Sequence, residues 1–169
     1  SGAPSMFAET NALNSTLGLI NSIVAAKIRL AINPTLNNNS GDVDKLPWML
    51  GEQEESVSHS LVDHLIALAK SDWNSFETSW DFTTLPLLSS DYRSGTLQNT
   101  YNALRNHWQS MTDEMLKLEE ENNRIFIDAY GLQDELTPDV PINEITLTCN
   151  PAYRYGQKVS QEVQEERLR

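Results

Sequence analysis

Apolar residues recur every three or four positions from Leu97 to Leu118, and this spacing limits the fold more than any other feature of the chain. Alternating steps of four and three place these residues on one face of a helix, as in a coiled-coil seam. The pattern continues to Gly131, and glycine commonly ends helices. We therefore predict a helix of about 35 residues, roughly 50 Å long. Its seam consists of Leu97, Tyr101, Leu104, Trp108, Met111, Met115 and Leu118.

A lone helix cannot bury this seam, so another helix must cover it. Residues 52–70 form the expected antiparallel partner, with an apolar stripe at Val57, Leu61, Leu65 and Leu68. If the Trp108 ring is fully buried, its replacement by Ala should cost about 3–5 kcal/mol. Asn122 also falls at a seam position, where a polar group is costly but can fix the register of a coiled coil. Replacement of Asn122 by Leu is therefore expected to be neutral or stabilising.

A further helix is predicted over residues 12–32, where apolar residues again repeat at helical spacing. Gly18, Ala25 and Ala26 are small, so another element can approach this helix closely. The helix should end at Asn33, because a residue that precedes proline avoids the helical backbone conformation. The polar stretch that follows, as far as Trp48, is predicted to be a loop.

Two shorter elements complete the expected organisation. Residues 145–148 are predicted as a short strand, and residues 157–169 as a polar helix. The predicted fold class is mainly α: a helical spacer with a long coiled-coil-like helix, helix-hairpin packing and at most a short strand pair. Three segments are expected, namely a helix and loop (1–50), a helical spacer with an aromatic loop and the long helix (51–131), and an extended segment with a polar helix (132–169).

The charge of the chain argues against direct binding to nucleic acid. There are 24 Asp and Glu residues against 12 Lys and Arg residues, so the formal net charge is -12 at pH 7. A domain that grips DNA phosphates needs a basic face, which the chain as a whole lacks. Residues 1–41 differ, because Lys27 and Arg29 against Glu9 leave a net charge of +1 there. Lys27 and Arg29 are therefore the candidates for residues close to DNA.

Several protein classes are disfavoured by composition. No run approaches the ~20 apolar residues that a membrane-spanning helix needs, so no membrane partner is expected. Cys149 is the only cysteine, which rules out an intrachain disulfide and fits a reducing cytoplasm. Its nearest cation in sequence is Arg154, and we expect the thiol to be unreactive. The chain begins at Ser1 and is expected to be a piece of a longer protein.

An aromatic loop follows the second helix. Four aromatic residues, Trp73, Phe76, Trp80 and Phe82, lie within ten positions of one another. They could pack into a satellite core under the loop, or form a partner surface or stacking platform. Packing is the favoured interpretation, because an exposed apolar patch of that size is unusual.

Asn150-Pro151-Ala152-Tyr153 differs at one position from Asn-Pro-Pro-Tyr, the active-site signature of DNA methyltransferases that modify an exocyclic amino group. In that signature the asparagine and a backbone carbonyl accept hydrogen bonds from the amine of a flipped base. Here the second proline is Ala152, and no Gly-rich turn is present to hold S-adenosylmethionine. A turn after a short strand is therefore the favoured interpretation.

Other catalytic and metal arrangements are incomplete. His59 and Asp63 lie four residues apart on one helix face, with His64 beside them, and a helix-surface pair is favoured over half of a metal site. Asp139 and Glu144 would need a lysine at position 146 to resemble a nuclease site, and that position is threonine. We predict no catalytic, cofactor-binding or metal-binding residue in this chain.

Three stretches nevertheless resemble a known family. Leu-Gly-Leu-Ile-Asn-Ser at residues 17–22 is followed by Asn33-Pro34-Thr35 with Asn37, by Gly41-Asp42 and by Leu46-Pro47. This order is similar to the end of the target-recognition region in large adenine-specific DNA methyltransferases. Residues 71–88 and 119–156 more specifically resemble the downstream region of the PglX-type methyltransferase of bacteriophage-exclusion (BREX) systems.

The resemblance implies a phage-defence enzyme that methylates adenine N6 with S-adenosylmethionine, of which this chain is a fragment downstream of the catalytic motifs. No catalytic residue carries over, because the motifs of the family that hold base and cofactor have no match here. We therefore expect a structural and positional role, in which the helical spacer holds recognition modules apart on DNA. The expected partners are the rest of the enzyme and DNA through it. The alternative is a protein-interaction module whose aromatic loop docks other defence-system proteins.

Overall fold

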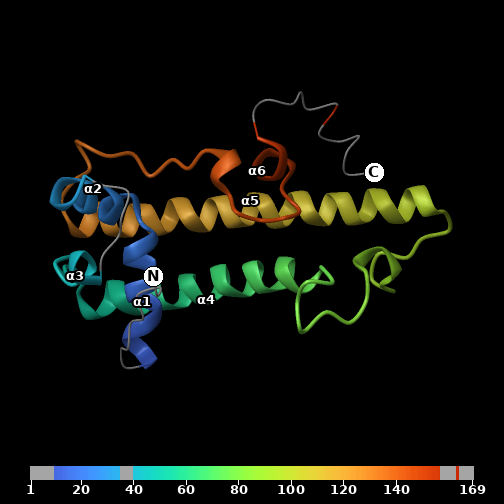
Figure 1. The fold of residues 1–169 in the computed structure, drawn as a ribbon, viewed down its shortest axis with the longest axis horizontal. Coiled ribbons are helices and arrows are strands. Elements are labelled where there is room, and N and C mark those ends of the chain that lie inside the picture. Colours follow the sequence, from blue (N-terminus) through green and yellow to red (C-terminus); the bar gives the residue numbers. More distant parts are fainter. Residues whose placement is uncertain (1–9, 35–39, 157–162, 164–169) are drawn as a thin grey trace. The chain divides into compact units, whose positions relative to one another are not determined.

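The computed structural model describes residues 10–34, 40–156 and 163, and within those ranges it contains helices and irregular segments but no strand (Figure 1). The longer helices are α1 (Thr10–Asn21), α2 (Ile23–Ile32), α4 (Glu52–Asn74) and α5 (Leu97–Ala129). The short ones are α3 (Ser40–Val43), η1 (Pro86–Leu88), η2 (Ile142–Glu144) and α6 (Pro151–Tyr155). The predicted mainly-α fold class is confirmed. The polar helix predicted over residues 157–169 lies, apart from Val163, outside the described residues.

The chain divides into two compact units. The first comprises Ser1–His64 and Leu118–Asp139, and the second comprises Leu65–Lys117 and Val140–Arg169. Helices α4 and α5 therefore each contribute one part to each unit. The three-segment organisation expected from the sequence remains a prediction.

The single helix predicted over residues 12–32 is wrong, because the chain bends by 69° between α1 and α2. Ser22 forms the break: its hydroxyl donates to the Leu19 carbonyl (2.7 Å) and accepts from the Ala25 N–H (3.2 Å). This N-cap supplies hydrogen bonds that a continuous helix would otherwise make. Within the described residues no single helix meets the length and apolarity criteria for crossing a membrane, and α1 and α2 meet them only as a bent pair.

The core of the first unit forms where the last turns of α5 meet α1 and α2. Phe126 and Ile127 are buried there, and each such side chain contributes about 1.5–3 kcal/mol through removal from water. The helix ends at Ala129, close to the predicted Gly131, because Gly131 adopts a positive φ of 66°. The N–H of Leu132 then reaches back to the Ile127 carbonyl (3.0 Å), as in a Schellman motif. The buried cluster consists of Leu19, Val24, Ala25, Leu50, Phe126 and Ile127.

Two buried asparagines of α5 bind the backbone where α1 turns into α2. Asn122 Nδ2 donates to the Gly18 carbonyl (2.9 Å), and Asn123 Oδ1 accepts from the Ile23 N–H (2.8 Å). The close approach expected at Gly18 is confirmed, because a Cβ on Gly18 would lie 2.8 Å from Asn122 Oδ1 and 3.1 Å from Ser58 Oγ. The expectation that Asn122 acts as a register residue in an apolar seam is wrong, since its amide serves a backbone carbonyl.

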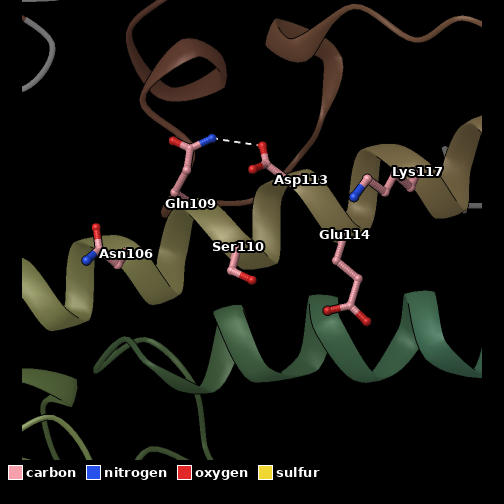
Figure 2. Close-up of a pocket in the computed structure, with 6 residues that line it drawn as sticks. All are labelled: Asn106, Gln109, Ser110, Asp113, Glu114 and Lys117. Atoms are coloured by element: carbon pink, nitrogen blue, oxygen red, sulfur yellow. Dashed lines mark hydrogen bonds between the residues drawn. The ribbon is translucent and has the colours of Figure 1, made fainter.

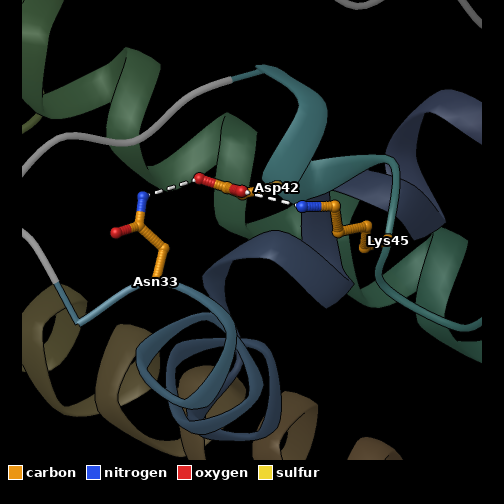
Figure 3. A network of polar contacts seen from close by, with 3 residues as sticks. All are labelled: Asn33, Asp42 and Lys45. Atoms are coloured by element: carbon orange, nitrogen blue, oxygen red, sulfur yellow. Dashed lines mark hydrogen bonds and ion pairs between the residues drawn. The ribbon is translucent and has the colours of Figure 1, made fainter.

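Polar contacts close the loop after α2 (Figure 3). Asn33 ends α2 in an extended conformation, as expected before Pro34. Asn33 Nδ2 donates to Asp42 Oδ2 (2.8 Å), and Asp42 Oδ1 lies 3.4 Å from Lys45 Nζ. Two residues of the family-like motif, Asn33 and Asp42, are thus brought together across the loop. Their contact ties α3 to the end of α2, which is a structural role.

The next motif residues lie against the end of α5. Leu46 packs against the core of the first unit, and the Pro47 carbonyl accepts a hydrogen bond from the Tyr130 hydroxyl. Burial of that hydroxyl raises the pKa of Tyr130. Leu46 and Pro47 therefore seat the segment after α3 on the end of α5.

In the second unit α4 and α5 run antiparallel (Figure 1). Leu65 and Leu68 of α4 pack against the cluster that contains Met111 and Met115 of α5, which confirms that part of the predicted cover of the seam, whereas Val57 of the predicted stripe is exposed. The irregular segment before α6 provides a second cover that the spacing did not predict, through buried Ile145, Leu147 and Cys149.

Two seam positions differ from expectation. Leu97 is 71% exposed, because it stands at the first turn of α5 before any cover begins. Trp108 is half-buried rather than fully buried. The cost of 3–5 kcal/mol expected for its replacement by Ala therefore falls to about 1–3 kcal/mol, since less apolar surface leaves the core.

We predict that Asn122→Leu destabilises the chain, contrary to the expectation from the heptad pattern. The substitution leaves the buried Gly18 carbonyl without its donor, which costs about 1–3 kcal/mol. Chemical denaturation monitored by circular dichroism measures the change. Asn106→Leu is the matched control, because Asn106 is exposed on the same helix, and its effect should stay within about 0.5 kcal/mol. Equal stability of the Asn122→Leu variant and the parent would contradict the assignment.

Candidate functional site

The Asn150-Pro151-Ala152-Tyr153 sequence forms the start of α6. Asn150 is 1% exposed, and its Oδ1 caps the helix by accepting from the Ala152 N–H (3.1 Å). Its Nδ2 donates to the carbonyls of Ile142 (2.8 Å) and Ile145 (2.9 Å). In a methyltransferase site this side chain would instead face the amine of a base. The predicted turn after a short strand is therefore wrong, because Asn150 caps α6 and no strand precedes it in the described residues, but the amide of Asn150 is engaged by the backbone of its own segment.

Asp72 of α4 holds the irregular segment that leads to α6. Its carboxylate is 5% exposed and accepts from the backbone N–H groups of Thr148 (2.6 Å) and Cys149 (3.0 Å). The short strand predicted over residues 145–148 is wrong, although Ile145 and Leu147 point inward alternately as in a strand. A carboxylate, rather than a neighbouring strand, binds the backbone there. Sequence reasoning missed Asp72, because nothing local marks an acid that pairs with a segment 76 residues away.

Cys149 is buried beside this carboxylate. Burial, together with the nearby Asp72 charge, raises the pKa of the thiol from its usual 9.0 to about 12. The expectation of an unreactive thiol agrees with this environment, because the thiolate is the reactive form. The raised pKa of the thiol makes the stability of the folded chain depend on pH. The stabilising contribution of the neutral thiol is complete below pH 9 and is lost as the pH rises towards 12.

The aromatic loop is more exposed than the favoured packing interpretation predicts. Phe76 and Phe82 are half-buried, but Trp73 is 55% exposed and Trp80 is fully exposed. Leu85 and Leu88, which follow in the loop and in η1, are also exposed. The packing interpretation is thus correct in part for the two phenylalanines and wrong for the two tryptophans. We call Trp73, Trp80, Leu85 and Leu88 the aromatic surface.

A cavity of about 370 Å³ lies in the second unit, between the end of α4, the loop around η1 and the first half of α5. Two carboxylates, Asp72 and Asp91, and three rings, those of Tyr92, His107 and Trp108, are among its lining groups. The rings of Tyr92 and His107 are in contact, with centroids 5.1 Å apart. Burial and the adjacent Asp91 charge raise the pKa of the Tyr92 hydroxyl. His107 is half-buried in this wall.

The outer face of α5 carries a second, wider hollow of about 490 Å³ (Figure 2). All of its lining side chains come from that one helix and are exposed. Gln109 Nε2 donates to Asp113 Oδ1 (2.8 Å), which is a helix-surface pair. Charges of both signs, Asp113, Glu114 and Lys117, stand on this face. No second element converges on it, so we interpret it as a solvated helix face.

The candidate DNA-proximal residues and the candidate metal pair lie on helices of the first unit, at Lys27 and Arg29 and at His59 and Asp63. Lys27 is exposed, whereas Arg29 is half-buried with its Nε hidden and without a hydrogen-bond partner. The two residues stand about 200° apart around α2, so they do not share one face. His59 Nε2 lies 3.5 Å from Asp63 Oδ2, the predicted pair, and Asp63 Oδ1 also accepts from Asn14 Nδ2 (2.5 Å).

Comparison with known proteins identifies relatives of the chain. It is 34% identical over 134 residues, or 78% of its length, to the adenine-specific methyltransferase PglX of Lacticaseibacillus casei (strain Zhang). It is 30% identical over 159 residues, or 92% of its length, to the adenine-specific methyltransferase BrxX of Escherichia coli O9:H4 (strain HS). The aligned parts are 11% and 12% of those relatives. No family model matches the chain.

We predict that Cys149 reacts with Ellman's reagent in the native chain only as fast as the chain opens. With a pKa of about 12, roughly one thiol in ten thousand is ionised at pH 8. Asp72→Asn should accelerate the reaction, because it weakens two charge-assisted hydrogen bonds that hold the segment, at a cost of about 1.5–3 kcal/mol. Asp113→Asn, an exposed carboxylate on α5, is the control and should leave the rate unchanged. A native rate equal to that of the denatured chain would contradict the buried position.

Proposed function

We propose that this chain, which belongs to the family of PglX-type adenine-specific methyltransferases and corresponds to about a tenth of their length, is a non-catalytic helical segment of such an enzyme. In this proposal it positions the parts of the enzyme that read DNA, within a phage-defence system of the BREX type. A cytoplasmic location belongs to the same proposal. The supporting observation concerns Asn150, the asparagine of the methyltransferase-like sequence. Its side chain forms hydrogen bonds with backbone groups of its own chain.

S-adenosylmethionine is the methyl donor proposed for the whole enzyme. The described residues do not fit it: the glycines are isolated in sequence, and those with positive φ, Gly131 and Gly156, end helices instead of forming a phosphate- or ribose-binding turn. No step of methyl transfer is therefore assigned to this segment. The segment would instead hold other parts of the enzyme in position through helices α4 and α5.

We propose that the rest of the enzyme, rather than this segment, makes most of the contacts with DNA. The net charge of -12 opposes the approach of phosphates. Lys27 and Arg29 remain the candidates for DNA-proximal residues, and no ion pair engages either of them in the described part of the chain. Because they point to different sides of α2, at most one of them could contact a given phosphate track.

A second candidate function is favoured by the exposure of the aromatic surface. Trp73 and Trp80 present two indole rings to solvent, and such residues are enriched where proteins bind one another. In this alternative the segment docks another protein element, either within the enzyme or in a different defence-system protein. The two functions are compatible, because a spacer can also carry a docking surface.

We predict that the isolated chain binds duplex DNA no more tightly than about 10⁻⁴ M at physiological salt. Its acidic surface repels the phosphate backbone, and the measurement is fluorescence anisotropy of a labelled duplex. Lys27→Glu with Arg29→Glu should weaken even this residual binding. Tight binding that survives the double substitution would contradict both the charge argument and the assigned residues.

The positional role itself is tested in the longer methyltransferase. Tyr153→Ala should leave site-specific adenine methylation within about twofold of the parent, because Tyr153 is an exposed residue of α6 and the neighbouring Asn150 is engaged by its own backbone. Removal of residues 10–156 should abolish site-specific methylation while binding of S-adenosylmethionine by the remaining chain persists. Methylation lost in the Tyr153→Ala variant with an intact fold would instead indicate a catalytic motif.

A further inference from the structure

The bend between α1 and α2 interrupts a helical backbone in which each N–H group would donate to the carbonyl four residues earlier. Ser22 would then donate to Gly18. The next N–H group, that of Ile23, would donate to Leu19. At the bend the Ser22 N–H instead donates to the Leu19 carbonyl (3.0 Å). The Gly18 carbonyl and the Ile23 N–H therefore need partners from outside their own helices.

Two adjacent side chains of α5 supply these partners. The amide nitrogen of Asn122 donates to the Gly18 carbonyl (2.9 Å), and the amide oxygen of Asn123 accepts from the Ile23 N–H (2.8 Å). Asn122 and Asn123 thus replace the donor and the acceptor that the bend removes from the helical ladder. Insertion of a side chain into this ladder is a recognised cause of sharp helix kinks, so the two asparagines account for the bend.

The sequence at the bend also suits a straight helix. Apolar residues keep helical spacing throughout residues 12–32, and no proline interrupts them. Ser22 caps α2 by accepting from the Ala25 N–H (3.2 Å). In a straight helix that N–H would donate to the Asn21 carbonyl instead. The N–H groups of Ser22, Ile23 and Ala25 therefore each have a partner in the bent and in the straight state.

Contacts within the first unit hold α1 in its bent position. The hydroxyl of Ser15 donates to the Glu55 carbonyl of α4 (3.2 Å). Gly18 lies so close to its neighbours that an added Cβ would stand 2.8 Å from Asn122 Oδ1 and 3.1 Å from Ser58 Oγ. Alanine at position 18 would therefore disfavour the bent state by steric conflict, and it would favour a straight helix by its higher helix propensity.

We infer that the joint between α1 and α2 is a two-state conformational device, which Asn122 and Asn123 hold bent and whose release lets residues 10–32 form one continuous helix. Val24 and Ala25 are buried in the core of the first unit, so α2 stays in place. Helix α1 then swings through the 69° that separates the two helices. The inference goes beyond the proposed positional role and stands on the described residues alone.

The angle between α1 and α2 is measured on the 169-residue chain from NMR residual dipolar couplings of the backbone N–H groups. The Asn122→Leu/Asn123→Leu variant should lower it from 69° to below about 20°, the limit of gentle helix curvature, because leucine offers neither donor nor acceptor. Both residues are replaced together, since either one alone still fixes one side of the bend. Asn123→Asp is the matched control: its carboxylate still accepts from the Ile23 N–H, so the bend should remain.

Gly18→Ala tests the joint without a change to either asparagine, and it should straighten the helix in the same way. Gly41→Ala is its control, because nothing lies within 4 Å of a Cβ at that position, and it should leave the angle unchanged. A circular dichroism melt establishes that each variant is folded.

A folded Asn122→Leu/Asn123→Leu variant that keeps the bend would overturn the inference, and so would a straight helix in the Asn123→Asp control. If the double variant does not fold, retention of the bend in Gly18→Ala overturns it instead. None of these results depends on methylation, so they are independent of the proposed positional role.

Discussion

Both units of this chain depend on the burial of one face of α5. A helix of 33 residues with a seam of leucine, methionine and aromatic side chains gains its stability from packing rather than from helix propensity. In the first unit that face meets α1 and α2, through Phe126 and Ile127. In the second it meets α4 and the segment that contains Ile145 and Leu147. The cover therefore combines helices with the irregular segment before α6, whereas coiled-coil spacing alone suggests a helical partner.

Polar side chains supply hydrogen bonds where regular secondary structure stops. Ser22 caps α2 at the bend, and Asn122 and Asn123 bind the backbone on either side of that bend. Asp72 and Asn150 do the same for the segment that precedes α6. Each of these side chains is buried, and a buried backbone group without a partner is costly. The irregular segments can therefore lie on the core only because these five residues serve their backbone groups.

This arrangement bears on what the segment can do within its family. The side chain of Asn150 binds backbone groups of its own segment, and the adjacent Cys149 is buried. Neither side chain is therefore open to solvent. The groups left open to solvent are of a different kind: the indole rings of Trp73 and Trp80, and the carboxylate of Asp91. Exposed rings and acids suit the recognition of protein rather than of phosphate. The positional role and the docking role proposed for the segment both draw on these features.

The sequence by itself determined the features that depend on neighbouring residues. Heptad spacing predicted α5, Gly131 its end, and Asn33 before Pro34 the end of α2, because these signals act within a few residues along the chain. The resemblance to the methyltransferase family was also readable from local motifs. Only the tertiary structure decided that the chain bends at Ser22, that Asn122 binds Gly18, that Asp72 takes the place of a strand, and that Trp80 stays outside the core. These outcomes depend on which distant groups meet, since a buried polar group needs a partner and an apolar ring needs a surface, and local spacing does not specify either.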